Sequence, residues 1–77
     1  MTLAEARVIV EGLIFAAERP LSAKEIGEII GLDQPAVEAL VEEIRRQHMS
    51  GALAISMLAG GYQMVTKPEL APWIEKL

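Results

Sequence analysis

The stretch PLSAKEIGEIIGLDQPAVEAL, residues 20–40, predicts two short helices joined by a tight turn. Ser22 and Glu25 have the spacing of a capping box, in which each side chain accepts a hydrogen bond from the backbone N–H of the other residue. Gly31 is placed to end the first helix, because glycine adopts the left-handed conformation that closes a helix without strain. Asp33 is then a good N-cap for a second helix that begins directly after it.

The apolar residues of this stretch suit two helices that pack against each other across the turn. Gly27 is small enough to let the helices approach closely, and Leu32 is placed to fill the angle between them. The second helix presents an apolar stripe, formed by Val37, Leu40, Val41 and Ile44. Together these features predict a helix-turn-helix unit.

The flanking segments extend this unit to a complete fold. On its N-terminal side, a capping box at Thr2 and Glu5 opens a helix that must end before Pro20. On its C-terminal side, residues 53–66 show a period of two on both sides of Ala59-Gly60-Gly61, which predicts a β-hairpin. The elements are therefore expected in the order helix, short extended segment, helix, turn, helix and hairpin. A winged helix-turn-helix domain, an α+β fold with a three-helix core, has this order.

The chain divides at the end of the predicted hairpin. Residues 1–67 form the winged-helix domain, and residues 68–77 begin a further helix that we interpret as a linker toward a second domain outside this chain. Trp73 allows two interpretations, because it either packs back on the domain or takes part in an interdomain contact. The apolar residues available for an interdomain contact are Leu70, Trp73, Ile74 and Leu77.

Composition disfavours several classes of protein. The 77 residues include no cysteine and one histidine, His48, so neither a disulfide framework nor a typical metal site is expected. Ser22 and Ser56 lack a base partner, and Gly60-Gly61 lacks the lysine of a phosphate loop, so we expect no enzyme activity and no cofactor. The long uncharged stretch at residues 47–66 contains too many polar residues and glycines for a membrane span.

Apolar residues are numerous for so short a chain. They make up 52% of the sequence when alanine and tyrosine are counted. A chain of this length buries only about 60–65% of its extended surface. Part of the apolar surface is therefore expected to meet a partner.

The first predicted helix carries apolar residues on two sides. Its main apolar face comprises Leu3, Ala6, Ile9, Val10, Leu13, Ile14, Ala16 and Ala17. A charged strip of Arg7, Glu11 and Glu18 separates this face from a second apolar patch. The second patch comprises Ala4, Val8, Gly12 and Phe15. A surface helix normally keeps its outer side polar, so two interpretations stay open: the core wraps the helix and buries Phe15, or the patch is a homodimer interface.

The charge pattern disfavours DNA binding, the usual role of a helix-turn-helix domain. The chain has 7 Lys and Arg against 11 Asp and Glu, a net charge of −4. The recognition helix would present to the phosphates Asp33, Glu38, Glu42 and Glu43. The hairpin turn contains no Lys or Arg. We therefore expect no direct DNA binding, and we keep a DNA-binding transcriptional regulator as the alternative.

Two segments carry a resemblance to a known family. EGLIFAA at residues 11–17, followed by RPLS at residues 19–22, resembles the E-A-L-L-F-A and P-L-S opening of segregation and condensation protein B. GGYQMVTKPE at residues 60–69 resembles the A-G-G-Y-R-L-V-T-K-P-E hairpin of that family. The likeness covers nearly the whole chain, with two departures: Gly12 replaces the usual Ala, and Gln63 replaces the usual Arg or Lys.

The resemblance implies the N-terminal one of two tandem winged-helix domains, in a protein without enzymatic activity. It implies that the N-terminal domains pair to form a homodimer. It also implies that this dimer binds the central segment of the kleisin subunit of a condensin-like complex, mainly through the C-terminal domain. In that family the kleisin bridges the heads of the SMC ATPase. The implied role is chromosome condensation and segregation in the cytoplasm, at the nucleoid.

Overall fold

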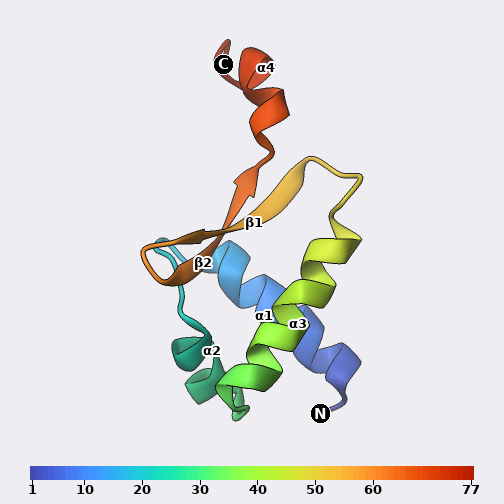
Figure 1. Cartoon of the computed structure of the whole chain (residues 1–77), viewed down its shortest axis with the longest axis vertical. Helices are drawn as coiled ribbons and strands as arrows, with labels where there is room; N and C mark the ends of the chain where they lie inside the picture. Colours follow the sequence, from blue (N-terminus) through green and yellow to red (C-terminus); the bar gives the residue numbers. More distant parts are fainter.

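The elements of the structure follow the order that the sequence predicts. A computed structural model describes all 77 residues (Figure 1). The elements are α1 (Leu3–Ala16), α2 (Ala23–Ile30), α3 (Gln34–Gln47), β1 (Leu53–Leu58), β2 (Gly61–Thr66), the 3₁₀ helix η1 (Pro68–Leu70) and α4 (Ala71–Ile74). The predicted α+β winged-helix fold is confirmed.

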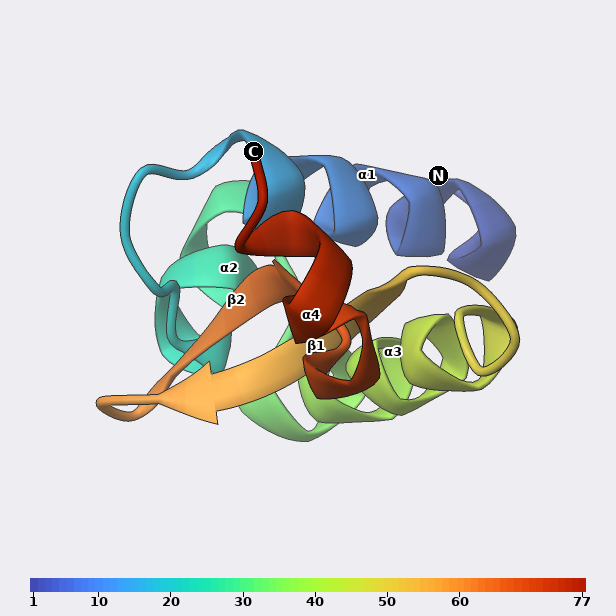
Figure 2. The ribbon, with the colours of Figure 1, turned by 90° about the horizontal axis from the view of Figure 1, so that it is seen from above.

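Three helices form the body of the domain, and the hairpin covers one end of it. α1 and α3 lie side by side, α2 packs against α3, and β2 packs against α1 (Figures 1 and 2). These elements enclose one apolar core, formed by Ala6, Val10, Ile14, Leu21, Ala23, Ile26, Val37, Leu40, Val41, Ile44, Ile55 and Tyr62. Burial of this single cluster fixes the helices and the hairpin relative to one another.

The predicted helix caps all form. The Thr2 hydroxyl accepts from the Glu5 amide at 3.1 Å, and the Glu5 carboxylate accepts from the Thr2 amide at 3.1 Å. Ser22 and Glu25 make the same pair of bonds at 3.0 and 3.1 Å. Asp33 accepts from the amide three residues further on at 3.0 Å. Each cap satisfies backbone N–H groups that the start of a helix leaves unpaired.

The turn between α2 and α3 depends on two glycines. Gly31 has a φ of 79°, and its N–H donates to the carbonyl of Gly27 at 2.8 Å. A Cβ on Gly27 would collide with the carbonyl oxygen of Leu32, whereas the nearest side-chain atom of α3, on Val37, lies 3.6 Å from that position. The backbone of the turn, more than the facing helix, therefore requires a small residue at position 27.

The hairpin closes through a two-residue turn. Leu58 pairs with Gly61, and between them Ala59 and Gly60 have φ values of 51° and 78°. Positive φ at both central positions is the geometry of a type I′ turn, which matches the twist of the two strands. Gly61, which the sequence places in the turn, is the first residue of β2.

The extended segment before α2 attaches to the free side of β2. Leu21 and Tyr62 exchange two backbone hydrogen bonds, at 3.0 and 2.7 Å. The segment runs so close to β2 that a Cβ on Gly61 would lie 2.9 Å from the carbonyl carbon of Pro20. The small residue at position 61 is what allows this approach.

The main apolar face of α1 is narrower than the sequence predicts. Ala6, Val10 and Ile14 are buried, but Leu3 and Ile9 are 71% and 41% exposed. The reason is that α3 and β2 cover only one side of α1. Leu13 is partly buried against the core, whereas Leu3, Val8, Ile9 and Phe15 are exposed.

Candidate protein-interaction site

The second apolar patch of α1 lies on the surface. Ala4, Val8, Gly12 and Phe15 are all exposed, and the exposed fractions of Val8 and Phe15 are 57% and 71%. The interpretation in which the core wraps α1 and buries Phe15 is wrong, because the other elements pack on the opposite side of the helix. We call these four residues the α1 patch. An apolar stripe with no partner in its own chain is typical of an interaction surface.

Gly12 lies in the middle of the α1 patch and has no role in the fold of its own chain. A Cβ placed there would meet no atom within 4 Å. A glycine inside a helix costs about 0.5–1 kcal/mol relative to alanine. Close approach of a second molecule is the kind of contact that would make use of the missing side chain.

The N-terminal half of the α1 patch is hollowed. A shallow cavity of about 470 Å³ is lined by Ala4, Glu5, Arg7, Val8 and Ile9. Three of these lining residues are apolar, and two, Glu5 and Arg7, are charged. Protein interfaces likewise combine apolar contact area with polar groups.

Two contacts to the end of α3 hold α1 in place beside the patch. Arg7 donates to the side-chain oxygen of Gln47 at 2.5 Å. One turn further along α1, Glu11 and His48 are hydrogen-bonded at 2.6 Å. His48 is the C-cap of α3, where the negative end of the helix dipole lies. Two residues of the charged strip, Arg7 and Glu11, thus tie α1 to α3.

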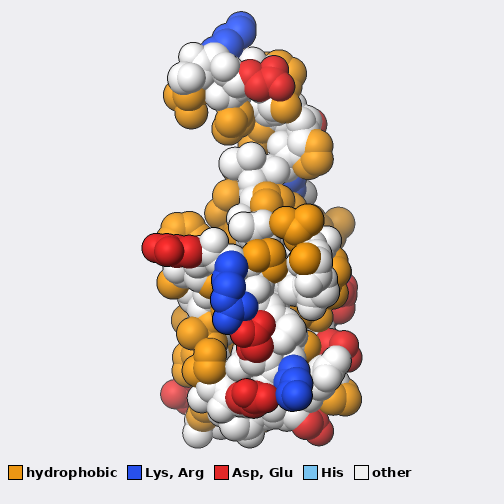
Figure 3. Space-filling model, turned by 90° about the vertical axis from the view of Figure 1, so that its left-hand side faces the viewer, with side chains coloured by type: hydrophobic (Ala, Val, Ile, Leu, Met, Phe, Trp, Pro, Cys, Tyr) orange, Lys and Arg blue, Asp and Glu red, His pale blue; other side chains and the backbone are white.

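The C-terminal segment projects from the hairpin and is not covered by the body of the domain (Figure 1). The exposed fractions of Trp73 and Ile74 are 67% and 40%, and Leu77 is fully exposed, whereas Leu70 is half-buried. Figure 3 shows hydrophobic side chains gathered on this projecting segment. The interpretation in which Trp73 packs back on the domain is wrong.

The surface that would meet DNA is acidic. Asp33, Glu38, Glu42 and Glu43 are exposed on α3 or at its start. Arg45 is engaged within the domain, because it pairs with Glu42 at 2.7 Å and donates to the carbonyl of Ile55 at 3.3 Å. Burial, together with the charge of Glu38, raises the pKa of the Tyr62 phenol. This face offers little cationic charge to a phosphate backbone.

No group of three or more His, Cys, Asp or Glu side chains lies together in the structure. Ser22 is engaged as the cap of α2, and its hydroxyl accepts from a backbone amide. None of the helices is long and apolar enough to cross a membrane.

A winged helix with an acidic recognition helix and an unpartnered apolar helix face is typical of winged-helix domains that bind proteins. Comparison with known families leads to a particular one. The family model of the segregation and condensation complex subunit ScpB matches residues 8–77. The chain belongs to this family, which confirms the resemblance of its opening helix and its hairpin.

Curated relatives of the chain are longer. A segregation and condensation protein B from Symbiobacterium thermophilum is 37% identical over 73 residues, which are 92% of this chain and 33% of that protein. The one from Halalkalibacterium halodurans is 34% identical over 80 residues, which cover 100% of this chain and 41% of that protein. The chain therefore spans between a third and about two fifths of the length of these relatives.

Solved structures share the fold. The crystal structure of a dimer of the ScpB N-terminal domain complexed with ScpA peptide has a TM-score of 0.89 and 30% sequence identity. The match covers 100% of this chain and 93% of that one. ScpB from Mycobacterium tuberculosis has a TM-score of 0.90 over 99% of this chain and 49% of its own, and at 18% identity it supports the fold alone.

Proposed function

We propose that this chain is the N-terminal winged-helix domain of a non-enzymatic accessory subunit of an SMC–kleisin complex, acting in chromosome condensation and segregation. Its family membership and its likeness to a solved ScpB N-terminal domain support the proposal. In this proposal residues 1–67 are the domain and residues 68–77 begin the linker to a second winged-helix domain. The subunit would act in the cytoplasm, at the nucleoid.

The domain forms a homodimer through the α1 patch. The observation that carries this step is the exposed apolar stripe with Gly12 at its centre, which nothing in the chain's own fold uses. A two-fold dimer brings the same surface of each copy together, so one apolar stripe suffices for both sides. The related ScpB N-terminal domain that matches the whole of this chain crystallised as a dimer.

The projecting C-terminal segment contacts the second winged-helix domain of the same protein. Its apolar residues Leu70, Trp73, Ile74 and Leu77 supply that contact. Support comes from the exposure of Trp73 and Leu77 and from the greater length of the relatives.

The partner of the dimer is the central segment of the kleisin and, through it, the SMC ATPase. The related ScpB N-terminal domain was crystallised with a peptide of ScpA, the kleisin. The acidic surface of α3 also supports a protein partner over a nucleic acid.

Two binding measurements separate this function from that of a DNA-binding regulator, the alternative that the fold itself favours. We expect the chain to co-purify with the kleisin from the same genome. We also expect no change in the fluorescence anisotropy of labelled 20-bp duplexes at physiological salt. Tight duplex binding without kleisin co-purification would replace the proposed function with transcriptional regulation.

A further inference from the structure

The hairpin has one edge that is free for backbone pairing. Tyr62 directs both its N–H and its carbonyl to Leu21, on the side of β2 away from β1. In an antiparallel ladder, residues alternate between pointing toward and away from the partner strand. Since Met57 lies opposite Tyr62, the backbone groups of Leu53, Ile55 and Met57 all point to the outer edge of β1.

No strand of the chain pairs with this outer edge. The sheet has two strands, and its isolated bridge lies on the β2 side. In Figure 2, β2 lies between β1 and α2, and β1 forms the outer side of the hairpin. Arg45 is the one side chain that reaches the edge, where its Nε donates to the Ile55 carbonyl at 3.3 Å. An open edge of this kind is a template for a further strand.

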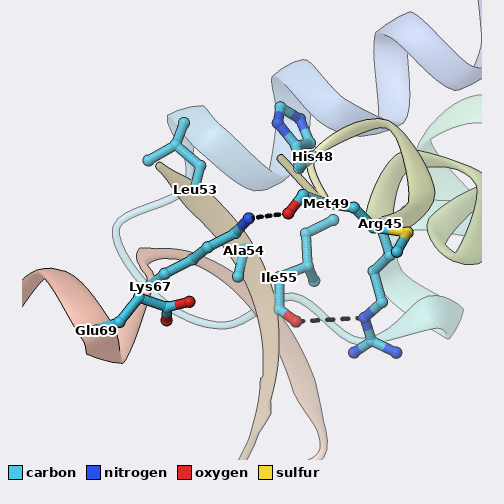
Figure 4. Close-up of a pocket in the computed structure, with 8 residues that line it drawn as sticks. All are labelled: Arg45, His48, Met49, Leu53, Ala54, Ile55, Lys67 and Glu69. Atoms are coloured by element: carbon cyan, nitrogen blue, oxygen red, sulfur yellow. Dashed lines mark hydrogen bonds between the residues drawn. The ribbon is translucent and has the colours of Figure 1, made fainter. Parts of the chain in front are cut away.

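A cavity of about 360 Å³ lies beside this edge, between β1 and the end of α3 (Figure 4). Apolar side chains of Leu53 and Ile55 line part of it. The charged and polar groups of the lining are those of Arg45 and His48, at the end of α3, and those of Lys67 and Glu69, just after β2. The cavity is large enough to hold one or two side chains of a peptide that runs along β1.

Lys67 is the cation of this cavity that has no acidic partner. Arg45 is paired with Glu42 at 2.7 Å and His48 with Glu11 at 2.6 Å. The Lys67 ammonium group donates to the carbonyl of Met49 and has no carboxylate within 4.0 Å. Glu69 lines the same cavity but forms no ion pair with Lys67, so the Lys67 ammonium group is the positive charge that an acidic side chain can pair with.

We propose that the outer edge of β1 binds an extended peptide of a partner protein, which adds to the hairpin as a third strand. An acidic side chain of the peptide lies at Lys67, and an apolar neighbour enters the cavity beside Leu53. Backbone pairing supplies affinity, and the cavity supplies specificity. This inference rests on the proposed function, because it names the surface that receives the kleisin segment.

The edge of β1 and the α1 patch share no residue, so the proposed dimer and the proposed peptide use different groups of the chain. The related ScpB N-terminal domain shows that a domain of this size takes a peptide while it is a dimer. A peptide partner also fits the open edge better than a nucleic acid does, because the free groups are those of a strand.

The test uses overlapping 20-residue synthetic peptides from the central segment of the kleisin of the same genome. We expect one acidic peptide to bind the isotope-labelled 77-residue chain. Its binding should slow the hydrogen exchange of the amides of Leu53, Ile55 and Met57, which are unpaired without it. The pattern of slowed amides identifies the binding site directly, without any substitution in the chain.

Two variants with matched controls test the parts of the site. Lys67→Glu should weaken binding at least 10-fold, whereas Lys24→Glu, the same change on the exposed side of α2, should not. Met57→Pro removes one edge donor while keeping the ladder to β2, and it should weaken binding. Met57→Ala, which keeps the N–H, serves as its control.

Three outcomes would overturn the inference. Binding without protection of the β1 amides would place the peptide elsewhere and would leave the proposed kleisin role intact. Failure of every kleisin peptide to bind would remove that role together with this site. A dimer that Met57→Pro dissociates, while Val8→Glu does not, would show that a second copy of the chain occupies the edge.

Discussion

Ala59 has a backbone conformation that suits another residue type. It is the one residue other than glycine with a positive φ, at 51°, and such a conformation costs an alanine roughly 1 kcal/mol. Asparagine tolerates the left-handed region and is preferred before glycine in type I′ turns. We expect Ala59→Asn to stabilise the domain by about 0.5–1 kcal/mol in urea unfolding. Ala52→Asn, outside the turn, is the control, and equal effects of both changes would contradict the turn geometry.

A side chain added at Gly12 should stabilise the monomer and weaken the proposed dimer. Because a Cβ there meets no atom of its own chain, Gly12→Ala should stabilise the monomer by about 0.5–1 kcal/mol through higher helix propensity. The same methyl group should weaken the dimer, and Gly12→Leu should weaken it further. Unfolding at low protein concentration reports the first effect, and sedimentation equilibrium reports the second. A dimer that is unchanged in Gly12→Leu would mean that position 12 is not in the interface.

The contacts that sequence reasoning missed join residues far apart in the chain. Glu11 and His48 are 37 positions apart, and Arg7 and Gln47 are 40 apart. The helical spacing of Arg7 and Glu11 was the available signal, because it places both on one side of α1. Nothing in the sequence showed that α3 would end beside them, since that depends on how the whole core packs.

The secondary-structure elements were predictable because their signals are local. Capping boxes, the left-handed Gly31 and the alternating hairpin pattern act within a few residues of the backbone they control. The α1 patch was visible in the same way as a second apolar stripe. Whether the core also covers this second stripe was not predictable, because Phe15 is as apolar as a core residue and only the packed structure leaves it exposed.

The start of α2 has an acid-sensitive cap. A hydrogen bond from Arg19, at 2.6 Å, and then one from the Ser22 amide lower the pKa of Glu25 from 4.5 to about 2. The stability that this carboxylate contributes is therefore present above pH 4.5 and is lost as the pH falls from 4.5 toward 2. The pair is exposed, so salt will reduce the effect.

Removing the arginine should reduce this acid sensitivity. We expect Arg19→Gln to raise the pKa of Glu25 toward 4.5, so that less stability is lost between pH 4.5 and pH 2. An NMR titration of the Glu25 side-chain carbons at low salt measures the change. Arg46→Gln, at an exposed arginine of α3, is the control. An equal Glu25 pKa in the wild type and in Arg19→Gln would refute the role of the ion pair.

The whole molecule presents three separate surfaces on an elongated body. Its extents are 41 × 24 × 17 Å, and the longest axis runs from the three-helix body to the projecting C-terminal segment (Figure 1). The α1 patch, the open edge of β1 and this segment lie on different elements. Much of the apolar surplus in the composition is found on them, as exposed Val8, Phe15, Met57 and Trp73. The proposed second copy, peptide and second domain would each have a surface of their own.

The proposed dimer has a mass that is directly measurable. Light scattering at micromolar concentration should give twice the chain mass of 8.4 kDa for the wild type and 8.4 kDa for Val8→Glu. Ile29→Glu, the same change at an apolar residue of α2 that is 62% exposed, should remain a dimer. Circular dichroism should show all three folded. A monomeric wild type, or a folded Val8→Glu that is still a dimer, would contradict dimerisation through the α1 patch.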